Sequence, residues 1–340
     1  MKVKTKEIRN VTRILDDIVT QYKEESQTTK RNWRTYEQQV AERLRTAFRE
    51  LKPLVHEAAS TITFVTGETR GAKPILTVEQ RTLALLIKHL IGKSNRTMSS
   101  MFVVFSLLSD IDVSYKTVER FYSDPEVIAV LHNLHSLILK KKGVKEVDGS
   151  GDGTGYSLTV KVNYAAHAQK LKDKVKNVET QSKKEYKRKL FVYSFKIIDL
   201  KSNMYVGFGT SLKSENDAFL ETIKMMENVD VKLLSIRLDK YYSCQEYVRL
   251  LREKFSDIEI TLLPKSNATV KGPWEWKRMM YDFITDPISY LENYFKRNHS
   301  ESGFSEDKKR TGWQLGQKRE DRIATADMLT SLWHNLHWLG

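Results

Sequence analysis

The chain has 340 residues, of which 57 are Lys or Arg and 43 are Asp or Glu, so its formal net charge is +14 and its pI is about 9.5. This excess of positive charge favours an anionic partner, most often a nucleic acid, although basic proteins without that role exist. Cys244 is the only cysteine, which excludes an intrachain disulfide and a zinc site built from several thiolates. No apolar stretch approaches the roughly 20 residues of a membrane-spanning helix, and the start of the chain lacks an apolar signal core. These features predict a reduced, cytoplasmic protein with one large domain and a smaller one.

Residues 1–77 predict a helical region followed by a linker. Apolar residues recur there at helical spacing in two runs, which are Ile8, Val11, Ile14, Leu15 and Ile18, and then Val40, Leu44, Phe48 and Leu51. Residues 61–77 hold a short apolar stretch and a turn with glycine, which predict a linker or a short strand. No pattern in this region points to chemistry. We favour a plain helical hairpin over a region that binds DNA ends.

Residues 78–142 predict a compact helical unit. Thr77 is a good N-cap for its first helix, and Ser114 is a good N-cap for a later helix that carries Lys116 and Arg120 near its start. A short helix, a turn and a second helix with basic residues in its first turns is the arrangement of a helix-turn-helix. An ordinary three-helix bundle is the alternative, and the sequence leaves both open. Lys116 and Arg120 are therefore candidate DNA-binding residues.

Strand signals begin after residue 142 and lead into a glycine-rich stretch at residues 148–157. Glycines stand on both sides of Asp152, which lets the backbone pass close to a ligand. Asp148, which is also followed by glycine, is a second candidate. The alternative is a glycine-rich hairpin with an aspartate in its turn.

Four more strands are predicted beyond this stretch, at Leu190–Ile198, Met204–Phe208, Val231–Leu238 and Ile258–Leu263. The apolar run at Val231–Leu238 is typical of a strand that is buried on both faces. Asp239 follows that strand directly. Since open α/β sheets place their sites at the carboxyl ends of central strands, Asp239 is a candidate metal ligand.

Residues 167–189 are the most basic part of the chain. They include Lys183, Lys184, Lys187 and Arg188. A solvated loop explains such charge without any function. In a DNA-processing core the same residues would contact phosphates, so they are candidate DNA-binding residues.

One predicted helical face near the C-terminus combines a phenol, two cations and a carboxylate, which are Tyr294, Arg297, Glu301 and Lys308. On one helix that turns about 100° per residue these four lie within roughly 60° of one another. Asp286 is a good N-cap for that helix, and Pro287 fits its first position. Gly303 weakens the helix, so a break before Lys308 is one alternative. Such a face suits a polyanion together with a metal ion, and the alternative is a solvated charged face.

The spacing Tyr-x2-Arg-x3-Glu-x6-Lys resembles the signature of a large family of DDE transposases from bacterial and archaeal insertion sequences. Asp-Gly-Thr-Gly at residues 152–155 resembles the form in which many of these enzymes carry their first catalytic aspartate. The resemblance covers residues 78–340. It implies an α/β fold in which residues 143–340 form an RNase H-like catalytic core, a mixed five-stranded sheet with flanking helices, after an all-helical N-terminal region.

The resemblance also implies the chemistry and the partners. Asp152, Asp239 and Glu301 would bind two Mg²⁺ ions, for which Mn²⁺ can substitute, and Tyr294, Arg297 and Lys308 would contact phosphates at the transposon end. The expected partners are double-stranded DNA, as terminal inverted repeats and as target, and further copies of the chain in a dimeric or larger synaptic complex at the nucleoid. The implied reaction is nicking at the element ends, followed by transfer of the 3′-hydroxyl into target DNA. The alternatives are an RNase H-like nuclease or resolvase without strand transfer, and a DNA-binding derivative without catalysis.

Overall fold

A mixed β-sheet lies at the centre of the computed structural model, which describes residues 4–25, 32–62, 76–92, 106, 112–158, 191–317 and 319–340. The strand order is β3-β2-β1-β4-β5, and a short β6 pairs with β1. The strands are β1 Glu146–Leu158, β2 Phe191–Asp199, β3 Tyr205–Ser211, β4 Lys232–Arg237, β5 Glu259–Thr261 and β6 Gln314–Leu315. β1, β2 and β3 pair in antiparallel fashion, whereas β1, β4 and β5 pair in parallel. The mixed sheet with its five predicted strands is confirmed, with β6 as an addition.

The glycine-rich stretch forms the middle of β1 and contains no hairpin turn. Its alternate residues point to opposite faces of the sheet. A Cβ on Gly151 would lie 2.6 Å from Leu238 Cδ2, and a Cβ on Gly153 would lie 2.3 Å from Glu215 Cδ. The side chains of Leu238 and Glu215 thus pack directly on the backbone of β1, where glycine has no side chain. The hairpin alternative is wrong, and Asp152 belongs to the face of β1 opposite the glycines.

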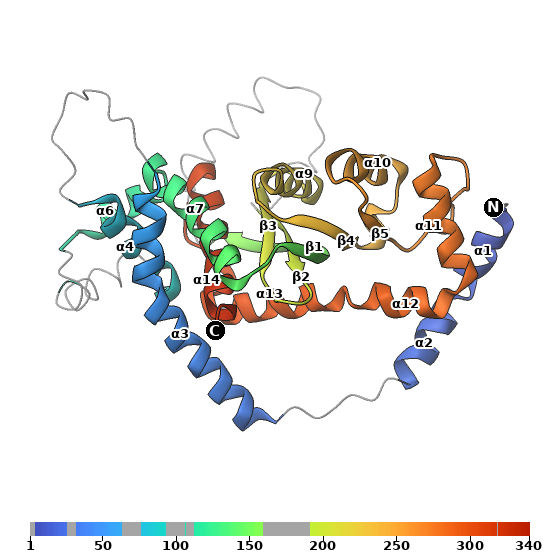
Figure 1. The fold of residues 1–340 in the computed structure, drawn as a ribbon, viewed down its shortest axis with the longest axis horizontal. Coiled ribbons are helices and arrows are strands. Elements are labelled where there is room, and N and C mark those ends of the chain that lie inside the picture. The colour runs from blue at the N-terminus through green and yellow to red at the C-terminus, as the bar shows by residue number, and fades with distance from the viewer. Residues whose placement is uncertain are drawn as a thin grey trace, which may run out of the picture.

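Helices cover both faces of the sheet (Figure 1). α9 (Glu215–Met226) and α10 (Gln245–Lys254) lie on the side of the glycines. α12 (Pro287–Phe295) and α13 (Asn298–Thr311) run almost end to end along the other side. α11 (Trp274–Thr285) precedes α12 at the edge next to β5. The face of Asp152 is therefore the face that α12 and α13 cover.

The C-terminal helix α14 (Glu320–Trp338) connects the sheet to a helical half of the molecule. It packs against β3 and against α3 (Trp33–Ser60), α4 (Val78–Ile91) and α7 (Pro125–Lys142). Residues of these helices and of the sheet belong to one continuous hydrophobic core. α14 is buried on nearly every side, which explains why its sequence shows little amphipathic pattern.

The remaining helices include α1 (Thr5–Arg13), α2 (Leu15–Glu25) and α6 (Tyr115–Phe121). α1 and α2 lie near α11, at the end of the molecule opposite α4 and α6 (Figure 1). The predicted caps of α4 and α6 are confirmed: Thr77 accepts from Gln80 N and Ser114 accepts from Thr117 N. Among the described residues no helix combines the length and the apolar character needed to cross a membrane.

Candidate active site

The helix predicted to carry all four residues of the signature is divided in two. α12 ends at Phe295 and α13 begins at Asn298, with hydrogen bonds of three-residue spacing from Arg297 N to Tyr294 O (3.0 Å) and from Ser300 N to Arg297 O (2.9 Å). The predicted single helix is therefore wrong at this point, whereas Gly303 lies inside α13 and does not break it. The tight turn keeps Tyr294 buried and leaves the Arg297 guanidinium 5.8 Å from the Tyr294 ring centroid.

The guanidinium of Arg297 lies among the three predicted catalytic carboxylates. Its Nη1 is 2.9 Å from Asp152 Oδ2, its Nη2 is 3.1 Å from Glu301 Oε1, and the same Nη2 is 3.9 Å from Asp239 Oδ1. Burial alone would lower the pKa of Arg297, but Tyr294 and the three carboxylates outweigh it and the pKa is raised. The structure thus brings residues from β1, from the end of β4 and from α13 around one cation.

The three carboxylates differ in their exposure. The side chain of Asp152 is 15% exposed, whereas those of Asp239 and Glu301 are 43% and 58% exposed. Burial raises the pKa of Asp152 to about 6. The Arg297 charge and the Gly153 N–H oppose this shift, and the charges of Asp239 and Glu301 add to it. Asp239 Oδ2 accepts from Tyr241 N at 3.2 Å, which fixes this side chain at the end of β4. The cluster is open to solvent on the side of Asp239 and Glu301.

Asp148 does not join this cluster. Its Oδ1 is 2.6 Å from Arg237 Nη1 and accepts a hydrogen bond from Ser235. Burial would raise the pKa of Asp148, but these two partners from β4 outweigh it and lower the pKa. Arg237 is in turn held by Asn293 in α12, to whose backbone oxygen Nε donates at 2.8 Å. Asp148 therefore ties β1 to β4 and α12.

Two serines fix α13 against β1 beside the carboxylates. The Oγ atoms of Ser150 and Ser300 are 2.7 Å apart, and Ser300 Oγ also donates to Ser150 O at 3.2 Å. Both serines are buried. Because Ser150 is two residues from Asp152 and Ser300 is one residue from Glu301, the two serines set the distance between strand and helix at the cluster.

The carboxylates of Asp152, Asp239 and Glu301 are chemically suited to bind a divalent cation. Three carboxylates from three elements supply the hard oxygen ligands that Mg²⁺ prefers, and they already share one positive group. Among the described residues, however, no three acidic, His or Cys side chains lie close enough together to hold one ion. We attribute the separation of Asp152, Asp239 and Glu301 to the Arg297 guanidinium, which lies between them. The residues fit a metal site only if Arg297 withdraws from it.

Lys308 lies apart from the Arg297 cluster. It follows Glu301 by seven residues of α13, which is about 10 Å along the helix axis. Its Nζ lies 5.5 Å from the ring centroid of Tyr156, near the end of β1. Lys308 thus occupies the same face of the sheet as Asp152, but nearer the end of the strand.

The other predicted DNA-binding residues lie elsewhere or outside the described residues. Lys116 and Arg120 are exposed, one helical turn apart on α6. Lys183, Lys184, Lys187 and Arg188 fall outside the described residues and stay a prediction.

A buried charged network escaped the sequence analysis. Lys196 Nζ in β2 is 3.5 Å from Asp307 Oδ2 of α13 and 3.5 Å from Asp327 Oδ1 of α14, and all three side chains are 0% exposed. Asp307 Oδ1 is 2.8 Å from His334 Nδ1, and Thr210 donates to Asp327 Oδ2 at 2.7 Å. The network joins α13 to the sheet and to α14, six residues beyond Glu301. The sequence feature that could have indicated this network is Lys196, which stands in the middle of the mostly apolar strand β2.

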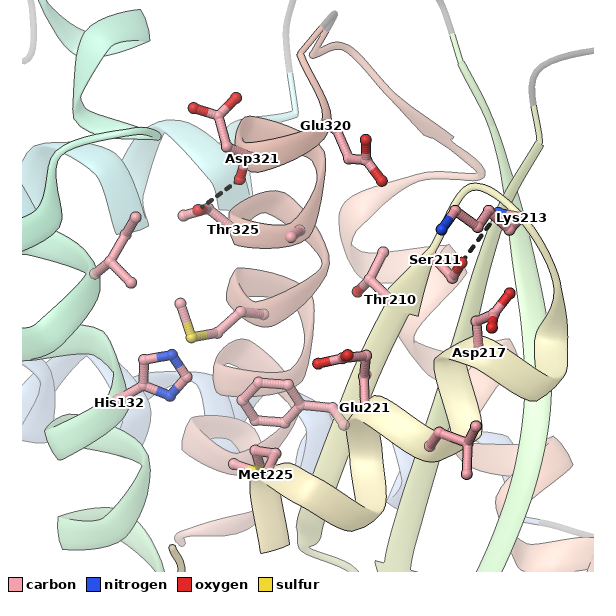
Figure 2. A pocket seen from close by; sticks show the side chains of 16 residues that line it. His132, Thr210, Ser211, Lys213, Asp217, Glu221, Met225, Glu320, Asp321 and Thr325 are labelled. Carbon is pink, nitrogen blue, oxygen red and sulfur yellow. Dashed lines mark hydrogen bonds between the residues drawn. The ribbon is translucent and has the colours of Figure 1, made fainter.

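A cavity of about 600 Å³ opens on the far side of β3 from the carboxylates. Figure 2 shows its walls, with His132 on α7, Thr210 and Ser211 on β3, Glu221 on α9 and Thr325 on α14. None of the three converging carboxylates lines it. The cavity is therefore separate from the candidate active site.

The chain is 39% identical over 337 residues to the probable transposase for insertion sequence element ISA1214 of Archaeoglobus fulgidus. The match covers 98% of this chain and 96% of that protein. A scan against protein-family models gives no match. The family predicted from the signature at Tyr294–Lys308 is thus confirmed by a relative over nearly the full length. The chain belongs to the family of insertion-sequence transposases.

Proposed function

We propose that the chain nicks DNA at the ends of an insertion sequence and joins the released 3′-hydroxyl to target DNA. The observation that carries this proposal is the convergence of Asp152, Asp239 and Glu301 on one cation, on the side of the sheet that α13 covers. The central sheet, antiparallel over β1 to β3 and parallel over β1, β4 and β5, has the arrangement expected of an RNase H-like core.

Asp152, Asp239 and Glu301 would hold two divalent cations, Mg²⁺ or Mn²⁺. When bound, such ions stabilise the charge on the attacking and the leaving oxygen of an in-line displacement at phosphorus. The carboxylates must be ionised to serve as ligands. Asp152, whose pKa burial raises to about 6, is the residue whose ionisation depends most on its surroundings. The low exposure of this side chain also keeps water from competing for it.

The two steps balance without a further reactant. In the first step a water oxygen bonds to the phosphorus at the element end, the bond from phosphorus to the 3′-oxygen breaks, and that oxygen takes up a proton. In the second step the new 3′-hydroxyl attacks a target phosphate and releases another 3′-hydroxyl. Each step forms one phosphorus–oxygen bond, to water or to the 3′-oxygen, and breaks one bond to a 3′-oxygen, so the same carboxylates can serve both. Tyr294 forms no covalent bond with DNA in this scheme.

Arg297 would change partners when DNA binds. A guanidinium holds a phosphate through two parallel hydrogen bonds, and in the free protein these donors are directed at Asp152 and Glu301. A DNA phosphate beside the cluster offers Arg297 another anion, while divalent cations offer the carboxylates another positive charge. Lys308 would bind a phosphate further along the same strand, and Lys116 and Arg120 would bind DNA away from the site.

Replacing Glu301 by Gln tests this function. The change keeps the size of the side chain but removes the charge needed to hold a cation. Nicking and strand transfer should both fall by on the order of 100-fold or more, whereas DNA binding in a metal-free buffer should persist. Glu292→Gln, on the exposed face of α12, is the matched control and should leave both steps unchanged.

The substrates separate the proposed function from its alternatives. DNA with and without the terminal inverted repeats of the element should be compared in the presence of Mg²⁺. Equal cleavage of both would indicate a nuclease or resolvase, and no cleavage of either would indicate a DNA-binding derivative. A Glu301→Gln protein that nicks at the wild-type rate would exclude the mechanism proposed here.

A further inference from the structure

A fourth carboxylate lies behind the strand that carries Asp152. Glu215, the first residue of α9, packs on the glycine face of β1, where a Cβ on Gly153 would lie 2.5 Å from Glu215 Oε1 and 2.7 Å from its Cγ. Alternate residues of a strand point to opposite faces, so Glu215 and the Asp152 side chain lie on opposite sides of β1. Glu215 therefore stands outside the cluster around Arg297 but contacts the backbone next to it.

The contact with Gly153 bears on the orientation of the Asp152 carboxylate. Gly153 N donates to Asp152 Oδ1 at 2.9 Å, so the peptide group between these two residues holds the side chain in place. Because Gly153 has no side chain, Glu215 lies directly against this peptide group. Glu215 therefore limits the movement of the backbone that fixes Asp152.

The same carboxylate is joined to Asp239. Tyr242 Oη donates to Glu215 Oε1 at 2.9 Å, and Tyr242 N donates to Asp239 O at 2.9 Å. Burial, and then the charge of Glu215, raise the pKa of Tyr242, so the hydroxyl keeps the proton that it donates. The Tyr242 ring is fully buried and packs against Phe195 and Phe219, at centroid distances of 5.3 and 4.9 Å. These contacts hold the short turn that follows Asp239.

The pairing of β1 with β4 ends before it reaches Asp152 and Asp239. The last paired residues are Ser150 and Arg237, and each aspartate follows two residues later on its own strand. Hydrogen bonds between the two strands therefore do not set the separation of the aspartates. On their own face Arg297 lies between them, and a metal site forms only when Arg297 withdraws. The connection behind the sheet then still joins the two strand ends.

We propose that Glu215 is a positioning residue for the reaction: bound to Tyr242 and packed on Gly153, it fixes the separation at which Asp152 and Asp239 share divalent cations. The inference rests on the proposed function and names a further residue that this function requires. Glu215 touches neither a cation nor DNA in this role. Its carboxylate serves as a hydrogen-bond acceptor and as a spacer between the two strand ends.

The test measures how tightly the protein binds Mn²⁺ and how much Mg²⁺ it needs for nicking. Mn²⁺ binding is followed by electron paramagnetic resonance on protein without DNA. Tyr242→Phe keeps the buried ring but removes the donor to Glu215. Its Mn²⁺ dissociation constant and the Mg²⁺ concentration for half-maximal nicking should both rise roughly 3- to 10-fold, the equivalent of one hydrogen bond. Saturating Mg²⁺ should restore nicking, whereas added metal would not correct a loss of folded protein.

Further variants test the contact with Gly153. Gly153→Ala places a Cβ where Glu215 lies and should displace its flexible side chain, so this variant should bind Mn²⁺ as weakly as Glu215→Ala. The double variant should be no worse than either single variant, because both changes remove the same contact. Glu215→Gln should recover most of the affinity that Glu215→Ala loses, since its amide oxygen still accepts from Tyr242.

Tyr247→Phe is the matched control. Tyr247 Oη donates to Asn216 Oδ1 at 2.6 Å, one residue further along α9, and its ring centroid is 5.6 Å from that of Tyr242. Tyr247→Phe should bind Mn²⁺ and nick DNA as the wild type does. Equal losses in the two Phe variants would overturn the positioning role, because they would indicate a general loosening of the aromatic side chains.

Two other results would also overturn it. One is a Tyr242→Phe protein with the Mn²⁺ affinity of the wild type, whether or not either protein nicks DNA. The other is a Glu215→Gln protein as impaired as Glu301→Gln, which would indicate that Glu215 acts through its charge. Because Mn²⁺ binding is measured without DNA, absence of nicking by the wild type counts against the proposed function alone.

Discussion

Arg297, in the turn between α12 and α13, donates a hydrogen bond from Nη1 to Oδ2 of Asp152 in β1, across 2.9 Å. This contact joins the signature at Tyr294–Lys308 to the glycine-rich strand 145 residues earlier. Both side chains are largely buried, at 14% and 15% exposed. The pair therefore stabilises the approach of α13 to β1 and at the same time occupies the space that a metal ion would need.

Arg297→Ala should increase the response of the protein to divalent cations. In the wild type an incoming ion must displace the guanidinium from Asp152 and Glu301, whereas in the variant the carboxylates repel one another and gain more from an ion. The melting temperature of the variant should be lower than that of the wild type in EDTA and should rise further on addition of Mn²⁺. Arg249→Ala removes an exposed pair of the same spacing with Glu253 in α10 and serves as the control. Equal shifts in wild type and Arg297→Ala would show that Arg297 does not compete with the ion.

Asp148→Asn should mainly reduce the stability of the protein, whereas Asp152→Asn should mainly reduce its nicking activity. Asp148→Asn leaves the buried Arg237 guanidinium without its ionic partner and should reduce the free energy of unfolding by about 1–3 kcal/mol, moderated because Asp148 is half-exposed. It should retain nicking in proportion to the folded fraction. Asp152→Asn should abolish nicking with a smaller effect on stability. Urea unfolding and a nicking assay on both variants provide the comparison, and loss of nicking in a stable Asp148→Asn protein would reverse the assignment.

Gly303→Ala should destabilise the protein although alanine favours helices. A Cβ at this position would lie 2.8 Å from the hydroxyl oxygen of Tyr205, whose ring is fully buried in β3. The rigid ring cannot move away, so α13 must shift, and overpacking of this kind costs about 1–3 kcal/mol. The double variant Gly303→Ala with Tyr205→Phe should recover much of the stability. Ser302→Ala, on the exposed side of the same turn, is the control. The measurement is thermal unfolding of the wild type, the single variant, the double variant and the control. A Gly303→Ala variant more stable than the wild type would contradict the expected clash.

Acid should weaken the buried network through Asp307. Burial alone would raise the pKa of this carboxyl, but His334, Lys196 and Arg310 outweigh it and lower the pKa to about 2. A carboxyl with a pKa lower in the folded than in the unfolded state stabilises the protein above its unfolded pKa of about 4, and this stabilisation is lost as the pH falls from 4 to 2. The loss should be about 2 kcal/mol. Urea unfolding at several pH values should show a smaller loss for Asp307→Asn than for the wild type, and parallel curves would contradict this.

The sequence by itself determined the elements of the catalytic core and their order. The alternation and length of the apolar runs gave the strands β2 to β5 within a few residues, because burial of one or both faces requires those patterns. Asp286 was correctly predicted as an N-cap, and its side chain accepts from Ser289 N at 3.1 Å. Capping depends on residues three positions apart, so it can be read locally. The signature spacing at Tyr294–Lys308 also sufficed to name the family.

Only the tertiary structure decided which aspartate of β1 joins the other two carboxylates. Asp148 and Asp152 are four residues apart in one strand, so both point to the same face and strand alternation does not distinguish them; only the resemblance at residues 152–155 favoured Asp152. The choice lies in their partners, Arg237 from β4 for Asp148 and Arg297, directly before α13, for Asp152. The turn at Arg297 was likewise invisible, because its three-residue hydrogen bonds depend on how α13 packs on β1. The ion pairs of Lys196 link residues 111 and 131 positions apart, and contacts of such range are set by packing alone.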